Sequence, residues 1–599
     1  MFINKIQNIN LMKIKASELV LILFFMALLG CEAPDDSVQV KIITTADVHA
    51  VIFPHDFIND TPMDGSLARV FTYVEKQREN KNQHVLLLDN ADLLQGQPTG
   101  YYFNFIADRE INLFADVMNH IGFDAASVGN HDVEMGPEVY NHLKKEFDFP
   151  WLAANIIDKK TGSPYFEPYV IFERDGVRIA VLGLVTPSVP TWLPRKLWEG
   201  LEFRGMYESA TEWMQYILDH EQPHAVIGLF HSGEGPDMEY AGVTEPPENA
   251  SLYVGRHVPG FDVIFTAHDH RVRNKTFTNV NDEEVLMIAG QSFGRSVAVA
   301  DLVFRKNEMG SFYLASKAGS VEEMAGYEPH AGFLATFDKE YQQVKEFVAQ
   351  PLGTLQKTLY SREAYRGNSA FVDFIHNIQL QLTGAEISLA APLSFNAVLE
   401  QGEVTVRDMF RLYPFENYLY VMTLSGQEIR DLLEYSYGLW YNTMAGPDDH
   451  LMLFRQDEQG ALQKDNNGRA RFANAFYNFD SAAGINYVVD VSKPVGQRVT
   501  IASLASGARF DPGRNYKVAI NSYRGSGGGG HVTHGAGIPH ADLDSRIVWV
   551  SERDLRGHIA DYIREAGLLS PEAGNNWKVI PADWAERAAE RDHKLLFGE

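Results

Sequence analysis

Five apolar segments of this chain each end in side chains that can bind metal ions. Apolar runs of this length are typical of buried strands, and strands in layered α/β domains present polar groups at their carboxyl ends. The segments are VQVKIITT, HVLLLDNA, FDAASVG, AVIGLF and DVIFTA, and the side chains that follow them are those of Asp47, His49, Asp92, Asn130, His131, His231, His268 and His270. Helix-like stretches separate several of the segments. We therefore expect a layered α/β domain with a site along one sheet edge.

The types and spacing of these side chains indicate a metal centre. Asp-x-His and His-x-His place alternate side chains on one side of an extended segment. Carboxylates, imidazoles and one amide suit Zn²⁺, Mn²⁺, Fe or Co better than Ca²⁺. Seven ligands are too many for one tetrahedral site, and they suit two divalent ions about 3.5–4 Å apart that share one carboxylate. Any one of these histidines, taken alone, is more often a surface or core residue. The predicted ligands are Asp47, His49, Asp92, Asn130, His231, His268 and His270.

The order of these motifs resembles the five signature blocks of calcineurin-like metallophosphoesterases. It is most similar to the secreted branch of 5'-nucleotidases, UDP-sugar hydrolases and 2',3'-cyclic-nucleotide phosphodiesterases, over residues 38–590. This resemblance implies a four-layer β-sandwich catalytic domain flanked by helices (38–325) and a second α/β domain that binds the nucleotide (353–590). Between them, the charged amphipathic stretch AGFLATFDKEYQQVKEFVAQ predicts one linker helix (326–352) that Pro351 and Gly353 end. Ala91 and Ala267 stand where the family has glycine.

The resemblance also implies a role for each residue of the site. The first metal takes Asp47, His49, Asp92 and His270, and the second takes Asp92, Asn130, His231 and His268. His131 stabilises charge on the phosphate or protonates the leaving oxygen, and Glu134 orients it, with Asp132 as a further catalytic candidate. The alternative is that His131 and Glu134 only stabilise the loop by capping hydrogen bonds. Two ions and two carboxylates leave a local charge of about +2, which can hold an anion although the chain carries a net charge of −27.

In the second domain the resemblance implies a pair of aromatic rings that clamp the base. Tyr413 and Tyr523 are the first choices, with Tyr477 and Phe479 as second choices; each could instead be a core residue. Tyr523 is followed by Arg524 and by four glycines at 527–530, a run that lets backbone approach a ligand closely.

The substrate prediction rests on a missing segment. Strict 5'-nucleotidases have Asn-x-Gly-x-x-Arg after the strand that matches ISLAAP, whereas this chain reads PLSFNAVLEQG, without arginine before Arg407. This difference favours 2',3'-cyclic-nucleotide 2'-phosphodiesterase and 3'-nucleotidase activity over 5'-nucleotidase or UDP-sugar hydrolase activity. A non-catalytic surface protein that binds nucleotides and a hydrolase of non-nucleotide esters are the remaining alternatives.

The N-terminus predicts export. Cys31, the single cysteine, follows a charged segment with Lys13 and Lys15 and an apolar run too short to span a membrane. Residues 1–31 resemble a bacterial lipoprotein signal with Cys31 lipidated; an ordinary secretion signal or a short anchor helix is the alternative. We therefore expect a monomeric cell-envelope lipoprotein that contacts the membrane only through its lipid. The net negative charge argues against a nucleic-acid polymer as partner.

Overall fold

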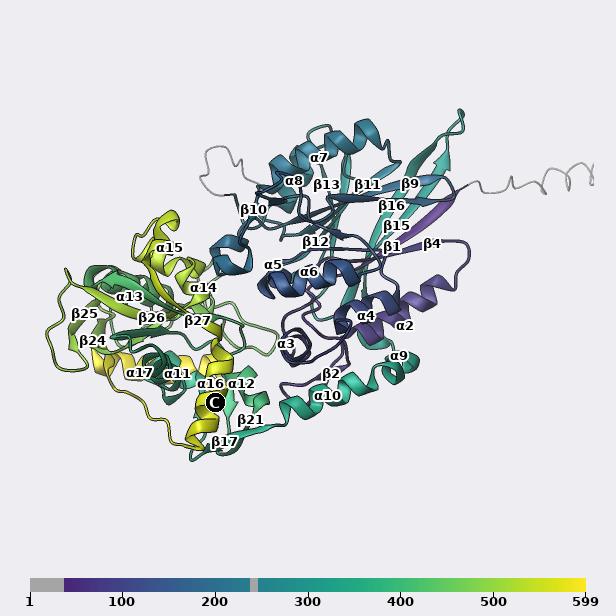
Figure 1. Ribbon diagram of the computed structural model, residues 1–599. Coiled ribbons are helices and arrows are strands. Elements are labelled where there is room, and N and C mark those ends of the chain that lie inside the picture. Colours follow the sequence, from purple (N-terminus) through teal and green to yellow (C-terminus); the bar gives the residue numbers. More distant parts are fainter. Residues whose placement is uncertain (1–36, 237–245, 599) are drawn as a thin grey trace, which may run out of the picture.

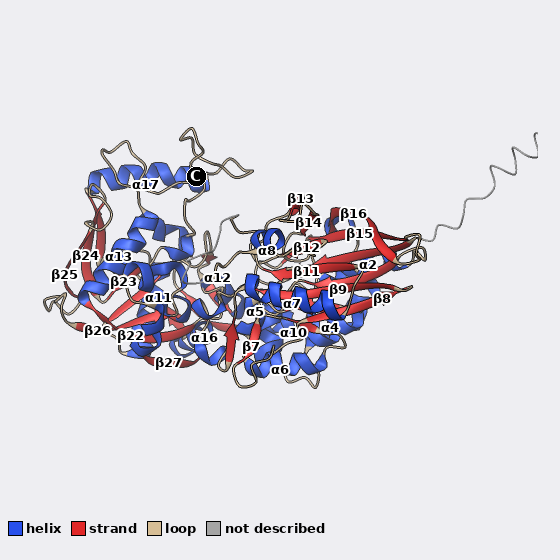
Figure 2. Cartoon of the chain, turned by 90° about the horizontal axis from the view of Figure 1, so that it is seen from above, coloured by secondary structure: helices blue, strands red, loops and turns tan. Residues whose placement is uncertain are grey.

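The protein consists of two α/β domains joined by a helical linker (Figure 1). The computed structural model describes residues 37–236 and 246–598. Viewed from above, the two domains lie side by side (Figure 2). The expected signal and Cys31 lie outside the described residues, and in the described part of the chain no helix is both long and apolar enough to span a bilayer.

The first domain contains two six-stranded mixed sheets, each with four parallel strands; the antiparallel pairings lie on one side of the first sheet and at both edges of the second. The first sheet runs in the order β16 (Phe312–Glu323), β15 (Ser296–Lys306), β1 (Val38–Thr45), β4 (His84–Asp89), β5 (Ala125–Ser127) and β6 (Trp151–Leu152). The second runs β13 (Arg273–Thr278), β14 (Glu284–Ala289), β12 (Val263–Thr266), β11 (Ala225–His231), β9 (Val177–Val185) and β8 (Tyr169–Arg174).

These sheets form a sandwich with helices on both outer faces, which confirms the four-layer architecture. Side chains from both sheets, such as Ile42, Leu88 and Ile227, share one buried cluster. The outer face of the first sheet is covered by helices that include α2 (Leu67–Arg78), α4 (Leu113–Ile121) and α6 (Pro137–Glu146). The outer face of the second sheet is covered by α7 (Met206–His220) and α8 (Ser251–His257). The five strands expected from the sequence are β1, β4, β5, β11 and β12, and they are divided between the two sheets.

The segment expected to form one linker helix forms two. Helix α9 (Ala331–Thr336) and helix α10 (Asp338–Val348) meet at Phe337, whose φ of −105° and ψ of 20° break the helix. The buried ring of Phe337 packs in the core of the first domain, so burial of this aromatic side chain accompanies the break. Pro351 does not merely stop the helix, because it already begins β17 (Pro351–Leu355) of the second domain.

The second domain is built on a five-stranded sheet and two three-stranded sheets. The larger sheet runs β23 (Ser481–Ala483), β19 (Ile387–Ala390), β26 (Asn515–Asn521), β22 (Tyr418–Ser425) and β27 (Ile547–Asp554). The smaller ones contain β25 (Val499–Leu504), β24 (Ile485–Asp490) and β29 (Trp577–Ile580), and β21 (Gly402–Thr405), β17 and β28 (Leu568–Leu569). The main helices are α11 (Ala370–Thr383), α12 (Val406–Leu412), α13 (Gly426–Trp440), α16 (Leu555–Ala566) and α17 (Ala582–Phe597), the last of which continues past the expected limit at residue 590.

Polar contacts join the two domains close to the predicted site. The Gln95 side chain donates a hydrogen bond to Glu416 (2.7 Å), and the buried Glu416 also pairs with Arg556 at 2.7 Å. The Lys196 ammonium lies 3.4 Å from the centre of the Tyr418 ring, a cation–π contact across the interface. The second domain therefore touches the loop that follows Asp92 in the first domain.

Candidate active site

The predicted metal ligands lie on loops that leave the carboxyl ends of strands in both sheets. Five of them have left-handed backbone conformations, with φ between 49° and 73°: Asp47, His49, Asp92, His268 and His270. Such conformations are costly for residues other than glycine, and they cluster at functional sites where the surrounding structure enforces them. Ala91 has a φ of 70°, which explains why glycine would suit this position; Ala267 is not in the left-handed region.

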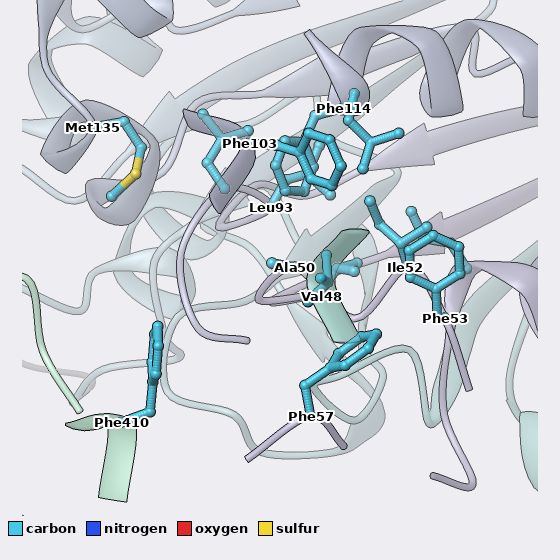
Figure 3. Packing of buried hydrophobic residues seen from close by; sticks show 14 of the residues in the cluster. Val48, Ala50, Ile52, Phe53, Phe57, Leu93, Phe103, Phe114, Met135 and Phe410 are labelled. Atoms are coloured by element: carbon cyan, nitrogen blue, oxygen red, sulfur yellow. The ribbon is translucent and has the colours of Figure 1, made fainter. Parts of the chain in front are cut away.

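Alternating side chains fix these loops to the core. Val48, Ala50 and Leu93 are buried in the apolar cluster behind the site (Figure 3), and they alternate with or adjoin the ligand residues. The apolar side chains anchor the strained backbone, so that the carboxylate and imidazole groups between them are presented on the opposite side.

Asp47, His49 and His270 form the first group of candidate ligands, and their ligand atoms lie within 4.8 Å of one another. The Nε2 atoms of His49 and His270 are 3.0 Å apart, and Nε2 of His270 is 3.5 Å from Oδ1 of Asp47. Burial lowers the pKa of His49 to about 3 and that of His270 to about 4, so both rings are neutral near pH 7. Two neutral imidazoles that turn nitrogen atoms toward one point beside a carboxylate are suited to a cation.

Asp92, His231 and His268 form the second group, again within 4.8 Å. The Nε2 atom of His231 lies 3.1 Å from Oδ2 of Asp92 and 3.2 Å from Oδ1 of Asn130. Asp47 connects the two groups, because its carboxylate accepts the backbone N–H of His268 at 3.0 Å. The structure thus brings together all seven side chains that the sequence selected, and the donor types fit divalent metal ions.

His131 and Glu134 form a pair beside the second group. Oε2 of Glu134 accepts a hydrogen bond from Nδ1 of His131 at 2.6 Å, and the backbone N–H of His131 donates to Oδ1 of Asp92 at 2.9 Å. Burial alone would lower the pKa of His131, but the negative charges of Asp92 and Glu134 outweigh it and raise the pKa to about 10. The pair has the arrangement expected of an imidazole that a carboxylate orients for proton transfer.

A cavity of about 320 Å³ extends from these residues to the second domain. The first domain contributes Asn130, His131, Glu134, Trp192, Leu193, Glu248 and His268, and the second contributes Leu393, Phe415, Asn417, Tyr477, Asn521 and Tyr523. One wall therefore carries candidate ligands and proton-transfer groups, and the facing wall carries aromatic rings and amides.

Comparisons with known proteins agree with this two-part site. Residues 40–272 match the model of the calcineurin-like phosphoesterases, and residues 350–535 match the model of the 5'-nucleotidase C-terminal domain. The chain is a calcineurin-like phosphoesterase with a 5'-nucleotidase C-terminal domain. It is a metallophosphoesterase by family, as the sequence predicted.

Among its relatives are two bacterial enzymes. The phosphoesterase is 27% identical to a 2',3'-cyclic-nucleotide 2'-phosphodiesterase/3'-nucleotidase of Yersinia enterocolitica, over 92% of this chain and 90% of the relative. It is also 27% identical to a trifunctional nucleotide phosphoesterase of Bacillus subtilis, over 92% of this chain but only 39% of that longer protein. Its fold follows that of a Staphylococcus aureus protein solved in complex with alpha-ketoglutarate, with a TM-score of 0.72 and 20% identity over 90% of this chain and 99% of that one.

The structure separates the aromatic candidates of the phosphoesterase into two sets. Tyr477 and Tyr523 line the cavity. Tyr413, a first choice from the sequence, is buried at 1% exposure with its hydroxyl 3.5 Å from the Asn417 amide, and it does not line the cavity. Phe479 is likewise buried and stacks on Trp440 with ring centres 5.3 Å apart. These two rings are core residues, because each is enclosed by its own domain.

Arg524 is buried and holds the two cavity tyrosines in place. Its Nε lies 2.7 Å from Oδ2 of Asp480, and its Nη2 donates to the backbone carbonyl of Tyr477 at 2.9 Å. The guanidinium lies 5.4 Å from the centre of the Tyr523 ring. The glycine run packs around the same groups, because a Cβ at Gly528 would lie 2.6 Å from the Tyr523 ring. The glycine run therefore allows the backbone to pack closely against Tyr523 and Arg524.

Asp132 also lies behind the cavity and contacts the loops that form it. It is 1% exposed, and its carboxylate accepts backbone N–H groups of Asp92, Leu93, Leu94 and Gly129. It does not line the cavity, so its position supports the loop of Asp92 and not a direct part in the chemistry.

Sequence reasoning did not select Trp192, Glu248, Phe415, Asn417 or Asn521, which all line the cavity. Asn417 and Asn521 lie close in sequence to the predicted clamp residues, four residues after Tyr413 and two before Tyr523. Trp192 and Glu248 carried no such signal, since their relation to the site depends on the path of the loops between strands.

Proposed function

We propose that this chain is an exported hydrolase of nucleotides that converts 2',3'-cyclic nucleotides to 3'-nucleotides and these to nucleosides and phosphate. The observation that carries the proposal is the single cavity with candidate metal ligands on one wall and Tyr477 and Tyr523 on the other. A nucleotide whose phosphate lies at the metal wall would place its base between or beside these rings. Offset stacking of this kind is worth about 0.5–1.5 kcal/mol beyond the buried area and tolerates any base.

Different residues of the first domain would have different roles in the reaction. Divalent ions held by the two ligand groups would supply positive charge for the phosphate and lower the pKa of an attacking water molecule. His131 would donate a proton to the leaving ribose oxygen from Nε2, since Glu134 holds its Nδ1. Asn130 would add a neutral ligand, which leaves the local charge positive.

Support for a substrate with one phosphate group comes from the charges around the cavity. Among the described residues no arginine or lysine lines it, and Glu248 adds a carboxylate. A second phosphate would find no arginine or lysine there, which disfavours nucleoside diphosphates and UDP-sugars. The missing Asn-x-Gly-x-x-Arg segment and the relation to the Yersinia enzyme support the cyclic and 3' substrates over 5'-nucleotides.

A panel of 2',3'-cyclic AMP, 3'-AMP and 5'-AMP, assayed with Mn²⁺, Co²⁺ and Zn²⁺ supplied separately, tests the proposal. We expect kcat/KM for the first two substrates to exceed that for 5'-AMP by at least about 10-fold, or 1.4 kcal/mol. If 5'-AMP or a UDP-sugar is the best substrate, the proposed specificity is wrong. Export as a lipoprotein is tested separately by Cys31→Ser, which should abolish incorporation of labelled palmitate.

A further inference from the structure

The buried ligand histidines His49 and His231 are oriented by backbone oxygen atoms. Nδ1 of His49 lies 3.0 Å from the carbonyl oxygen of Gln95, and Nδ1 of His231 lies 2.9 Å from that of Asn90. A neutral imidazole has one N–H, and a carbonyl can only accept. With a metal ion bound, each ring would therefore keep its proton on Nδ1 and turn an Nε2 lone pair toward the ion.

His268 is oriented in the opposite sense and by a side chain. Its Nε2 lies 2.9 Å from Oε1 of Glu248, so Nε2 is the donor and Nδ1 is left to bind a metal ion. The ring is further fixed by Trp192, which stacks on it with ring centres 5.5 Å apart and an interplanar angle of 24°.

We propose that Glu248 is a positioning residue for the second metal, because it fixes the tautomer and the ring orientation of His268. The inference rests on the two-metal part of the proposed function. A carboxylate that accepts the second N–H of a ligand histidine makes the ring a stronger ligand, and loss of such a partner typically costs 10–100-fold in metal affinity.

The loop that carries Glu248 is built onto the strand end of another ligand. The Ser232 hydroxyl donates to the backbone carbonyl of Glu248 at 3.1 Å, and the Gly233 N–H donates to the Asn249 side chain at 2.7 Å. Ser232 and Gly233 directly follow His231. The contacts thus tie Glu248 to the same group of ligands that its carboxylate orients.

The position of Glu248 predicts an effect on one metal only. Its carboxylate contacts His268 of the second group, and among the described residues it forms no hydrogen bond or ion pair with Asp47, His49 or His270. Its side chain is 49% exposed, so truncation should not disturb folding. It also borders the cavity beside Tyr477 and Tyr523, which places it next to the proposed nucleoside site.

Titration of the metal-free protein with Mn²⁺ alone, followed by electron paramagnetic resonance and by metal content after dialysis, tests the proposal. We expect Glu248→Ala to bind the first Mn²⁺ as the wild type does and to bind the second 10–100-fold more weakly. Glu248→Gln should lose less, because its amide oxygen still accepts the N–H of His268. Glu308→Ala, in an exposed turn far from the site, is the control and should bind both ions normally.

Unchanged affinity for the second ion in Glu248→Ala, or an equal loss at both sites, would overturn the positioning role. Should Glu248→Ala fold poorly, Glu248→Gln decides alone, and wild-type affinity together with wild-type spectra would then contradict the proposal. A wild-type chain that binds fewer than two Mn²⁺ would overturn the two-metal centre and this inference with it.

Discussion

Asp132→Ala should destabilise the first domain and weaken metal binding together. The carboxylate of Asp132 accepts four backbone N–H groups, from Asp92 at 3.1 Å, Leu93 at 3.0 Å, Leu94 at 3.3 Å and Gly129 at 2.9 Å. All of these residues are buried, so the alanine variant leaves four donors without a protein partner. The loop that carries Asp92 would lose the contacts that hold its left-handed backbone in place.

The size of the effect follows from the number of donors. An unsatisfied buried donor costs about 1–3 kcal/mol, and the lower value for each of four gives about 4 kcal/mol. For a large domain, 1 kcal/mol lowers the melting temperature by about 2–4 °C, so the expected decrease is about 8–16 °C. Differential scanning calorimetry of the metal-free protein measures this decrease, and metal content after dialysis reports the displacement of Asp92.

Asp262→Ala is a matched control at the other end of the second sheet. Its carboxylate accepts one backbone N–H, that of Val226 at 3.0 Å, so we expect a loss of about 1–3 kcal/mol and normal metal content. If Asp132→Ala instead keeps its melting temperature and its metal ions but loses activity, Asp132 takes part in catalysis, as the sequence alone suggested, and the positioning role is wrong.

Three further outcomes test the site. Asp92→Ala should abolish activity and lower the metal content at both sites, and a variant that retains two ions per chain would contradict the shared carboxylate. His131→Ala should keep both ions and lose about 10²–10⁴-fold in kcat, the usual contribution of a general acid, with a smaller loss in Glu134→Gln; loss of metal would show that His131 is a ligand. Tyr523→Ala should raise KM for all nucleotides and spare bis(p-nitrophenyl) phosphate, and equal losses for both kinds of substrate would exclude the clamp.

The candidate metal ligands could be selected from sequence because they lie in the short stretches that follow apolar strands. Strand ends such as those before Asp92 and His231 are local features, and burial of the strand fixes where the next residues emerge. The sequence could not show that these strands are divided between two sheets, because all of them are similar apolar runs. The four-layer arrangement came from the family resemblance and is confirmed by the structure.

Residues that act through other residues were harder to predict. Asp132 was expected to be catalytic because it adjoins His131, but its partners at 92–94 lie some 40 positions earlier in the chain. Tyr413 was chosen because the family resemblance implies a clamping ring at this position, whereas burial at the end of α12 turns its ring into the core. A motif gives the type of a side chain, and tertiary packing decides which way it points.

Gln95 connects the candidate metal site of the first domain to the second domain. Its backbone carbonyl accepts the N–H of His49, and its side chain donates to Glu416, which Arg556 neutralises. A buried carboxylate is tolerated only when it is paired and hydrogen-bonded, so Glu416 requires both partners. The residue that orients the candidate metal ligand His49 is therefore held by an ion pair of the other domain. The same domain contributes the tyrosines of the cavity, so the contacts that orient His49 and the rings that face the metal wall depend on one arrangement of the two domains.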